Sequence, residues 1–274
     1  MKADLHNHSY FSDGFLSPRE IVRLASDANC DLFALTDHDS TNGIVEAKSE
    51  ADKLGINLIN GVEISAFWRN SAIHIVGLGI DIHNDELQTG LEFNQKLRKE
   101  RAKKIALGLW RSGIKDALEK AQMLSGGHML TRTHFAQMLI NEGYCKDMKS
   151  VFRRYLTGRK PGGVRVEWKD FKEVIKWVQS SGGKALIAHP FRYRMTHNKI
   201  KNMLIDFKEA NGDGFEVINA NSSDQEISLG NQWIEEYDLL ASVGSDFHGW
   251  PNQRVQIGNL ADLPNNSRAI WSYL

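Results

Sequence analysis

Two histidines and an aspartate stand close together near the start of the chain, in the stretch ADLHNHSYFSDG at residues 3–14. His6 and His8 are separated by one residue, so on a strand both side chains point to the same face. Asp13 follows in the loop behind them. Imidazole and carboxylate groups are ligands that divalent transition metals prefer. This stretch therefore predicts a metal-binding strand end.

Further histidine and acidic residues recur beside other short apolar runs of the chain. They are His38, Glu63, His74, His189, Asp246 and His248. Each lies at or near the end of a predicted strand, where the ligand sites of parallel α/β folds collect. So many of these groups at one rim would repel one another and be poorly solvated without cations. One ion takes about four to six ligands, so the set predicts two or three ions.

Two or three metal ions that share one rim would suit the transfer or hydrolysis of phosphoryl groups. Neighbouring ions can stabilise the attacking and the leaving oxygen of an in-line displacement at phosphorus. Carboxylate and neutral imidazole ligands suit Mn²⁺, Fe²⁺ or Zn²⁺. The set contains no cysteine, which argues against a structural zinc site.

Short β-like runs alternate with helical patterns along most of the chain. The runs lie at 3–8, 32–36, 56–64, 72–80, 184–189, 214–219 and 239–245, and helical patterns lie at 17–28, 41–54, 168–181, 197–210 and 224–237. This alternation predicts a mainly parallel sheet that closes, or nearly closes, into a barrel. Only seven residues separate Ile64 from Ala72, too few for a parallel crossover. We therefore expect this pair of strands to be antiparallel or irregular and the barrel to be distorted.

Residues 85–163 have a different pattern, with a long basic amphipathic helix ending at Gly113 and three shorter helices, each closed by glycine. Residues 91–165 carry 17 Lys and Arg against 6 Asp and Glu, a net charge of +11, although the whole chain is neutral. Such asymmetry is typical of a surface that binds polyanions, although a solvated helix face rich in lysine would look similar. We expect 1–84 to be the first part of the barrel, 85–163 a basic insertion that covers the substrate, and 164–274 the second part.

The composition is that of a globular chain, with 274 residues and 41% hydrophobic residues. No apolar run reaches the ~18 residues of a membrane span, and no signal-peptide pattern is visible. Cys30 and Cys145 lie far apart, as small buried residues of a reducing compartment would. We expect a cytoplasmic protein with no membrane and no obligate protein partner.

The motifs DLHNHSYFSDG, ALTDHDS, GVEIS, HIVGLGI, AHPFRY and GSDFH, in this order, resemble the PHP (polymerase and histidinol phosphatase) superfamily of metal-dependent phosphoesterases. The resemblance implies a distorted (β/α)₇ barrel with a helical insertion between the fourth and fifth strands. It also implies a trinuclear centre, often of Mn²⁺, with Fe²⁺, Zn²⁺ or Mg²⁺ as alternatives. The implied ligands are His6, His8, Asp13, His38, Glu63, His74, His189, Asp246 and His248. The nucleophile is then a water held by the metal cluster, with no separate protein nucleophile. Asp37 and Asp39, which flank His38, are either orienting residues or helix caps, and we favour caps.

The insertion resembles one bacterial branch of the superfamily through TRTHFAQML, with Arg132 and His134, and YLTGRKPGG, with Arg159 and Lys160. Members of this branch remove the 3′-phosphate of 3′,5′-nucleoside bisphosphates and, like ribonuclease AM, act 5′→3′ on short RNA. The resemblance implies a hydrolase of RNA processing and nucleotide metabolism that releases 5′-mononucleotides. The expected partners are nucleoside 3′,5′-bisphosphates and short 5′-phosphorylated RNA. We predict that Arg101, Arg132, His134 and Lys160 bind the substrate phosphate.

Two other functions share parts of this sequence pattern. A histidinol-phosphate-type small-molecule phosphatase would use the same metal chemistry, but a basic insertion suits its cationic substrate poorly. A non-catalytic metal module attached to a polymerase would be expected to have lost ligands, and the chain has no polymerase region.

Overall fold

The computed structural model describes residues 1–251 and 254–274, in which the strands form a single sheet in chain order. The strands are β1 (Ala3–Asp4), β2 (Leu32–Leu35), β3 (Asn57–Trp68), β4 (Ser71–Leu78), β5 (Lys184–Ile187), β6 (Gly214–Asn219) and β7 (Leu240–Gly244). The chain after β1 returns to β7: the Leu5 N–H donates to the Val243 carbonyl at 3.0 Å, and Asn7 bridges Phe247 in parallel. The sheet is therefore a nearly closed barrel, as predicted.

The barrel is distorted at β4, which is antiparallel to both of its neighbours, whereas the other pairs are parallel. β3 and β4 form a hairpin whose turn is Arg69 and Asn70, with Arg69 at φ 50°. The short Ile64–Ala72 connection had predicted an antiparallel or irregular pair, and this prediction is confirmed. Because Ser65 pairs with His74, the hairpin carries Glu63 and His74 side by side on one rim.

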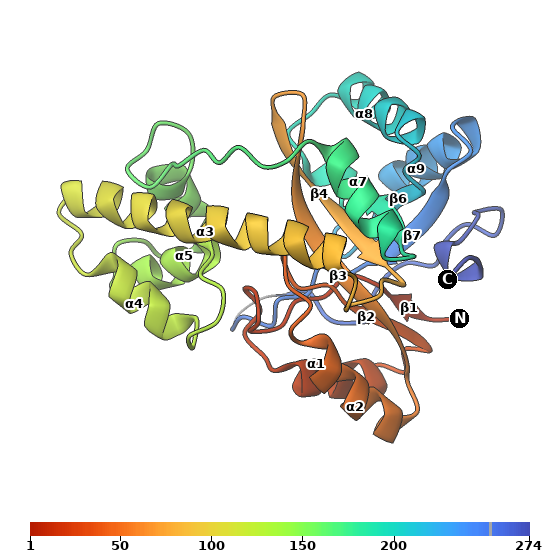
Figure 1. Ribbon diagram of the computed structural model, residues 1–274, viewed down its shortest axis with the longest axis horizontal. Coiled ribbons are helices and arrows are strands. Elements are labelled where there is room, and N and C mark those ends of the chain that lie inside the picture. The colour runs from red at the N-terminus through yellow and green to blue at the C-terminus, as the bar shows by residue number, and fades with distance from the viewer. Residues whose placement is uncertain (252–253) are drawn as a thin grey trace.

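Five helices cover the outside of the barrel (Figure 1). They are α1 (Pro18–Asp27), α2 (Ile44–Leu54), α7 (Phe171–Ser180), α8 (His197–Glu209) and α9 (Asp224–Glu236). α1 begins where the sequence indicated, because the Ser17 side chain accepts from the Glu20 N–H and the Glu20 side chain accepts from the Ser17 N–H. The apolar side chains of these helices and of the strands form one core, with a second cluster under α1 and α2.

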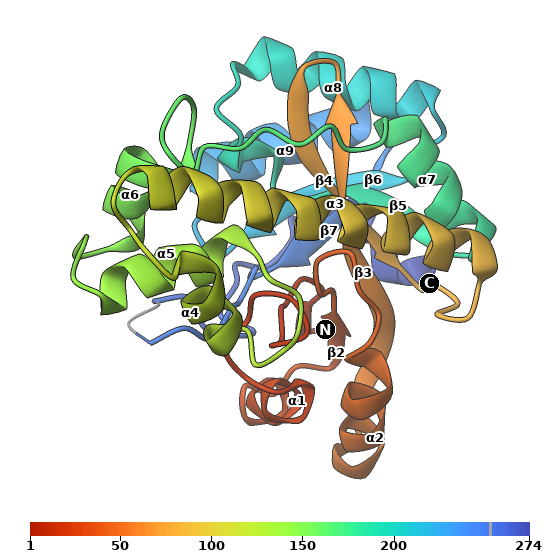
Figure 2. The same ribbon diagram turned by 60° about the vertical axis from the view of Figure 1, so that its left-hand side comes forward.

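A helical segment projects from the barrel between β4 and β5 (Figures 1 and 2). It consists of α3 (Asp85–Arg111), α4 (Ala117–Leu124), α5 (Arg132–Asn141), α6 (Met148–Val151) and the π-helix η1 (Phe152–Leu156). We call residues 85–163 the cap. Residues 164–170 lead from it back to α7 without helix or strand.

The helix α3 contributes side chains to two separate hydrophobic cores. Leu87 and Leu91 pack into the barrel core, and Gly90 lies so close to Trp177 that a Cβ there would be 2.4 Å from the indole. Ile105 and Leu109 pack into a separate core made with α4, α5 and η1. The first half of the helix is thus anchored to the barrel and the second half supports the cap. The division at 84 and 163 stays a prediction.

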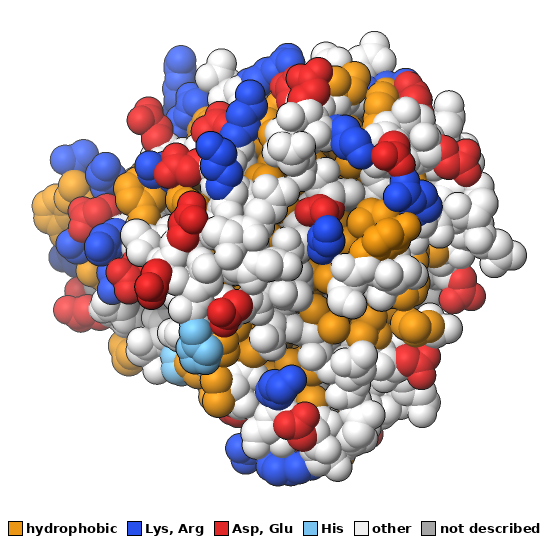
Figure 3. Space-filling view, turned by 45° about the vertical axis from the view of Figure 1, so that its right-hand side comes forward, with side chains coloured by type: hydrophobic (Ala, Val, Ile, Leu, Met, Phe, Trp, Pro, Cys, Tyr) orange, Lys and Arg blue, Asp and Glu red, His pale blue; other side chains and the backbone are white. Residues whose placement is uncertain are grey.

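Cys30 and Cys145 are both buried and free, and burial raises the pKa of the Cys30 thiol to about 11. In the described ranges no helix is both long enough and apolar enough to cross a bilayer. On the face shown in Figure 3, basic and acidic side chains are interspersed.

Candidate active site

All nine predicted metal ligands lie together at one rim of the barrel. They come from the ends of β1, β2, β5 and β7, from the loop after β1, and from the β3–β4 hairpin. The parallel strands bring their carboxyl ends to the same rim, and the antiparallel hairpin adds Glu63 and His74 from the side. The site is therefore built by elements distant in the sequence.

Glu63 is the centre of this cluster and is fully buried. Its Oε2 lies 3.2 Å from Nε2 of both His6 and His8. Its Oε1 lies 2.8 Å from His74 Nδ1 and 3.0 Å from His189 Nε2. One carboxylate thus touches imidazoles from three parts of the barrel, as a bridging ligand would.

Two aspartates complete the cluster on either side of Glu63. Asp13 Oδ1 lies 3.2 Å from His248 Nε2, and Thr133 of the cap donates to Asp13 Oδ2 at 2.8 Å. Asp246 Oδ1 lies 3.2 Å from His8 Nε2. The side chain of Arg192 forms an ion pair with the other Asp246 oxygen.

The buried charges are matched within the rim. Burial opposes ionisation of Glu63, but His38, His74 and His6 outweigh it and hold the pKa of this carboxylate well below its usual range. Burial also opposes protonation of His8, but Asp246 and Glu63 raise its pKa to about 10. At His38 burial prevails and lowers the pKa to about 4. Near pH 7 Glu63 is therefore ionised, the form that ligates metals, whereas His8 carries a proton that a bound ion would displace.

The donor atoms fit a metal centre. Asp13 Oδ1, His38 Nδ1, Glu63 Oε2 and His189 Nδ1 are buried and make no hydrogen bond in the part of the chain that the structure describes. Glu63 Oε2 and His38 Nδ1 are 2.8 Å apart without hydrogen-bond alignment. Buried polar atoms without partners are costly, and a cation between them would remove that cost.

The ligand atoms also cluster closely enough to share ions. Within each of three groups, one donor atom per residue lies within 4.8 Å of the others: His8, Asp13, His38 and His248; His6, His8, Glu63 and Asp246; and His38, Glu63 and His74. The groups overlap through His8, His38 and Glu63, so neighbouring ions would share ligands. The donor set of the rim therefore suits a metal centre, with His189 outside the three groups.

Glu216 in β6, which was not predicted, adjoins two residues of this cluster. Its Oε1 is 2.5 Å from His6 Nδ1, and its Oε2 accepts from the His189 N–H at 2.7 Å. It thereby orients one ligand through its ring and another through its backbone. His189 is held in the left-handed region, at φ 32°, by this contact. The available signal was a lone acidic residue inside the apolar run GFEVIN.

The prediction that Asp37 and Asp39 cap a helix is wrong. α2 begins after Gly43 with no side-chain cap. Asp37 accepts from the Ser9 N–H at 2.7 Å and so holds the loop after β1. Asp39 accepts from the Ser65 N–H at 2.9 Å and from Arg98 Nε at 2.6 Å. Both carboxylates are buried and orient backbone beside the metal ligands, because loops packed inside a barrel rim need partners for their N–H groups.

The Asp39–Arg98 pair also ties the cap to the rim. Arg98 belongs to α3, is only 7% exposed and donates a second hydrogen bond to Ser65 Oγ at 2.8 Å. Asn94, one turn earlier, donates to Asp39 Oδ1 at 2.8 Å. α3 is thereby held over the strand end that carries His38.

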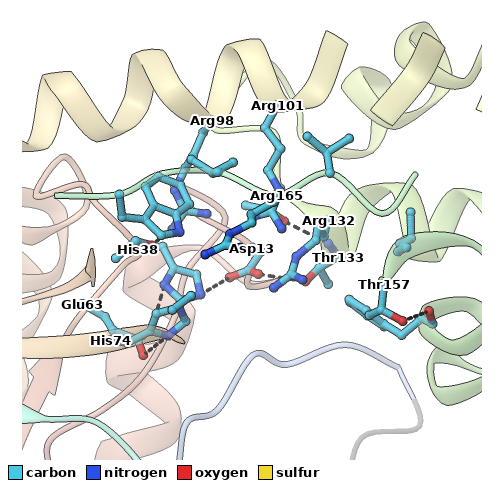
Figure 4. A pocket seen from close by; sticks show the side chains of 18 of the residues that line it. Asp13, His38, Glu63, His74, Arg98, Arg101, Arg132, Thr133, Thr157 and Arg165 are labelled. Carbon is cyan, nitrogen blue, oxygen red and sulfur yellow. Dashed lines mark hydrogen bonds and ion pairs between the residues drawn. The ribbon is translucent and has the colours of Figure 1, made fainter. Parts of the chain in front are cut away.

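A cavity of about 770 Å³ separates the rim from the cap. The metal-ligand residues form one wall, and four arginines face them: Arg98, Arg101, Arg132 and Arg165 (Figure 4). A third wall is apolar and contains Phe67, Phe152, Val164, Val166, Trp168 and Tyr193. The cavity is large enough for a nucleotide-sized ligand.

Arg98 pairs with Asp39, but the other three arginines lack such charge compensation in the described part of the chain. Arg101, Arg132 and Arg165 form no ion pair within residues 1–251 and 254–274, and Arg101 Nε is buried without a hydrogen bond. Burial, with the positive charges of Arg132 and Arg98, lowers the pKa of Arg101 to about 8. Such a cluster favours an anion that would neutralise it.

Two of the four predicted phosphate ligands, Arg101 and Arg132, line this cavity. The structure does not bring His134 and Lys160 there. His134 is the third residue of α5, where its Nδ1 accepts from the Thr131 N–H at 3.1 Å. Lys160 is exposed within the loop of residues 157–163, of which Thr157, Gly158 and Gly163 line the cavity but Lys160 does not. Arg98 and Arg165 were missed, although Arg98 stands three residues before Arg101 and so on the same helix face.

The distorted barrel and its metal centre agree with comparisons to known proteins. Residues 4–217 match the PHP domain family, and the chain belongs to this family. It is 40% identical over 272 residues to the 3′,5′-nucleoside bisphosphate phosphatase of Chromobacterium violaceum, covering 99% of this chain and 95% of that protein. It is 39% identical over 273 residues to a 5′-3′ exoribonuclease of Haemophilus influenzae, covering 98% of each.

A solved structure gives the same result for the fold. An amidohydrolase from Chromobacterium violaceum, determined with bound sulfate and no metal, is 40% identical and superposes with a TM-score of 0.94, covering 100% of this chain and 95% of that one. The predicted family, the predicted barrel and the predicted hydrolase class are confirmed. The names of the relatives agree with the predicted branch and do not favour the histidinol-phosphate alternative.

Proposed function

We propose that this enzyme hydrolyses the phosphoester on the 3′ side of a nucleoside that carries a 5′-phosphate. The substrates are 3′,5′-nucleoside bisphosphates, which lose their 3′-phosphate, and short 5′-phosphorylated RNA, which is shortened 5′→3′ with release of 5′-mononucleotides. One observation carries the proposal: a metal centre and a cluster of uncompensated arginines face each other across one cavity.

The two walls suit two phosphates of one nucleoside. The scissile 3′-phosphate would lie at the rim, and the 5′-phosphate would lie against Arg101, Arg132 and Arg165. Guanidinium groups bind phosphate oxygens through paired hydrogen bonds, and burial strengthens them. The nucleoside between them would contact the apolar wall, where Arg98 lies over the Trp168 ring and Arg165 over the Phe67 ring.

The nine rim residues would hold two or three divalent ions; the donor set suits Mn²⁺, Fe²⁺ or Zn²⁺, and the family resemblance favours Mn²⁺. When bound, the ions would activate the attacking water and offset the charge that develops on the phosphate. The residues around them keep the ligands in place: Glu216 orients His6, Arg192 pairs with Asp246, and Thr133 donates to Asp13.

A histidinol-phosphate-type substrate fits this cavity less well. Its amino group would be positively charged and would face Arg98, Arg101 and Arg132. Like charges in a partly desolvated cavity repel. The arginine wall therefore selects a second anion rather than a cation.

The test compares substrates that differ only in their terminal phosphates. With Mn²⁺ supplied, we expect turnover of adenosine 3′,5′-bisphosphate and of a 5′-phosphorylated oligoribonucleotide, and slow turnover of the same oligonucleotide with a 5′-hydroxyl. Products are resolved by chromatography. Equal rates with and without the 5′-phosphate, or shortening from the 3′ end, would refute the proposal.

A further inference from the structure

Two smaller cavities lie outside the active site and adjoin each other around the segment between α4 and α5. One, of about 240 Å³, is lined by Tyr10, Gly14, Phe15, Leu124, Ser125, Gly126, His128, His134 and Trp250. The other, of about 670 Å³, lies along α3 and is lined in part by Phe11, Lys96, Lys99, Lys103, Ser125 and His128. Ser125 and His128 line both cavities, so the two are neighbours, and we call them together the track.

The aromatic end of this track borders the metal-ligand loops. Trp250 Nε1 donates to the Asp13 carbonyl at 2.6 Å, and the Phe15 N–H donates to the His248 carbonyl at 2.7 Å. The rings of Phe15 and Trp250 are 5.3 Å apart, and Phe15 is 51% exposed. A large exposed ring beside a catalytic loop is available for stacking.

The other end of the track is basic. Lys96, Lys99 and Lys103 follow one face of α3, at spacings of three and four residues. The one acidic residue of this cavity within the described ranges is Glu100, which pairs with Lys103. Lys96 and Lys99 have no carboxylate partner in the same ranges. Phe11 and Tyr10 both lie 4.7 Å from the His128 ring, so aromatic rings continue along the track.

We propose that this track binds single-stranded RNA on the 3′ side of the scissile phosphate. Stacking rings that alternate with a basic groove are the usual means of holding a single strand without sequence preference. The aromatic end would receive the first bases beyond the rim, and the lysines would contact the following phosphates. The inference rests on the proposed function and adds to it, because a mononucleotide bisphosphate has no such extension and does not reach the track.

The test measures binding without turnover. A 5′-phosphorylated decaribonucleotide with a 3′ fluorophore is titrated by anisotropy in the presence of chelator. Phe15→Ala and the double variant Lys96→Gln/Lys99→Gln should each weaken binding about tenfold. The double variant should also reduce the log–log salt dependence of the dissociation constant by about 1.4, since each phosphate contact on a single strand contributes about 0.7. The control Lys172→Gln/Lys176→Gln removes two exposed lysines from α7 and should bind like the wild type.

Kinetics separates this inference from the proposed function. In the wild type kcat/KM should rise from a dinucleotide to a decanucleotide, and in the track variants this rise should flatten. If the variants bind the decamer as tightly as the wild type and keep the rise of kcat/KM with RNA length, the proposal that the track binds RNA is refuted. A wild type that turns over neither bisphosphate nor RNA would overturn the proposed function, and the chelated binding measurement would still decide whether the track holds RNA.

Discussion

The barrel rim and the cap face the same cavity, but the charged groups of the rim are paired within the protein and two arginines of the cap are not. At the rim each buried carboxylate touches imidazoles, and Glu216, Arg192 and Thr133 complete the network. On the cap side Arg101 and Arg132 face the cavity with no carboxylate within ion-pair distance among the described residues. The rim is thus organised before a substrate binds, whereas the cap arginines gain their counter-charge from the substrate.

Under the proposed function, this difference gives the two regions separate tasks. A preorganised rim provides the chemistry, because electrostatic catalysis requires groups that do not reorganise during the reaction. The cap provides recognition, because binding an anion relieves the repulsion among its arginines. Changes at the rim should therefore affect kcat and metal content, and changes on the cap should affect KM and the choice of substrate.

The largest effect is expected from Glu63→Gln, which keeps the shape of the side chain and removes its charge. Because Glu63 contacts the imidazoles of all three ligand groups, turnover should fall about a thousandfold or more. Elemental analysis should find fewer bound ions. The matched control is Glu50→Gln, which changes a buried glutamate that pairs with Arg23 on the outside of the barrel. This variant should retain both its turnover and its metal content. Normal metal content in Glu63→Gln would contradict the prediction.

Arg101→Met should have the next largest effect. It should lower the activity on 5′-phosphorylated RNA and raise the stability of the fold. Loss of a charge-assisted contact should lower kcat/KM for 5′-phosphorylated RNA about thirtyfold and abolish the preference over 5′-hydroxyl RNA. The free energy of unfolding should rise by about 1 kcal/mol, since a half-buried cation without a partner is replaced by an apolar side chain. Both are measured on one preparation, by kinetics and by denaturant titration. Lower stability together with lower affinity would indicate a structural role for Arg101 instead.

Glu216→Gln tests whether the rim depends on residues that do not bind the metal themselves. The amide keeps the size of the side chain but weakens the hydrogen bond to His6, so metal affinity and turnover should each fall about 10- to 100-fold. Excess Mn²⁺ should restore part of the activity. Failure of Mn²⁺ to restore any activity would show that Glu216 acts on the fold rather than on the ligand.

The contrast between the two regions also explains which parts of the site could be predicted from the sequence. Strand ends of a parallel barrel meet at one rim, so short apolar runs followed by His or Asp were enough to indicate the side chains that gather there. Glu216 was missed because an acidic residue within an apolar strand gives no indication of its partner. The cap depends on helix packing that local patterns do not determine. His134 is a case in point: TRTH reads as a possible phosphate motif, but the structure uses Thr131 and His134 to begin α5.

The smallest effect is expected from Gly108→Ala in α3. A Cβ at this position would lie 1.8 Å from the Pro161 carbonyl oxygen, so the loop of residues 157–163, which lines the cavity, would have to move. Metal content should not change, because the loop carries no ligand. KM for the bisphosphate should rise about fivefold with little change in kcat, since binding geometry is altered and the rim is not. The neighbouring Leu107→Ala, at a side chain that is 47% exposed, serves as the control. A fall in kcat at constant KM would mean that the cap contributes to the chemistry, and the division of tasks between cap and rim would then be wrong.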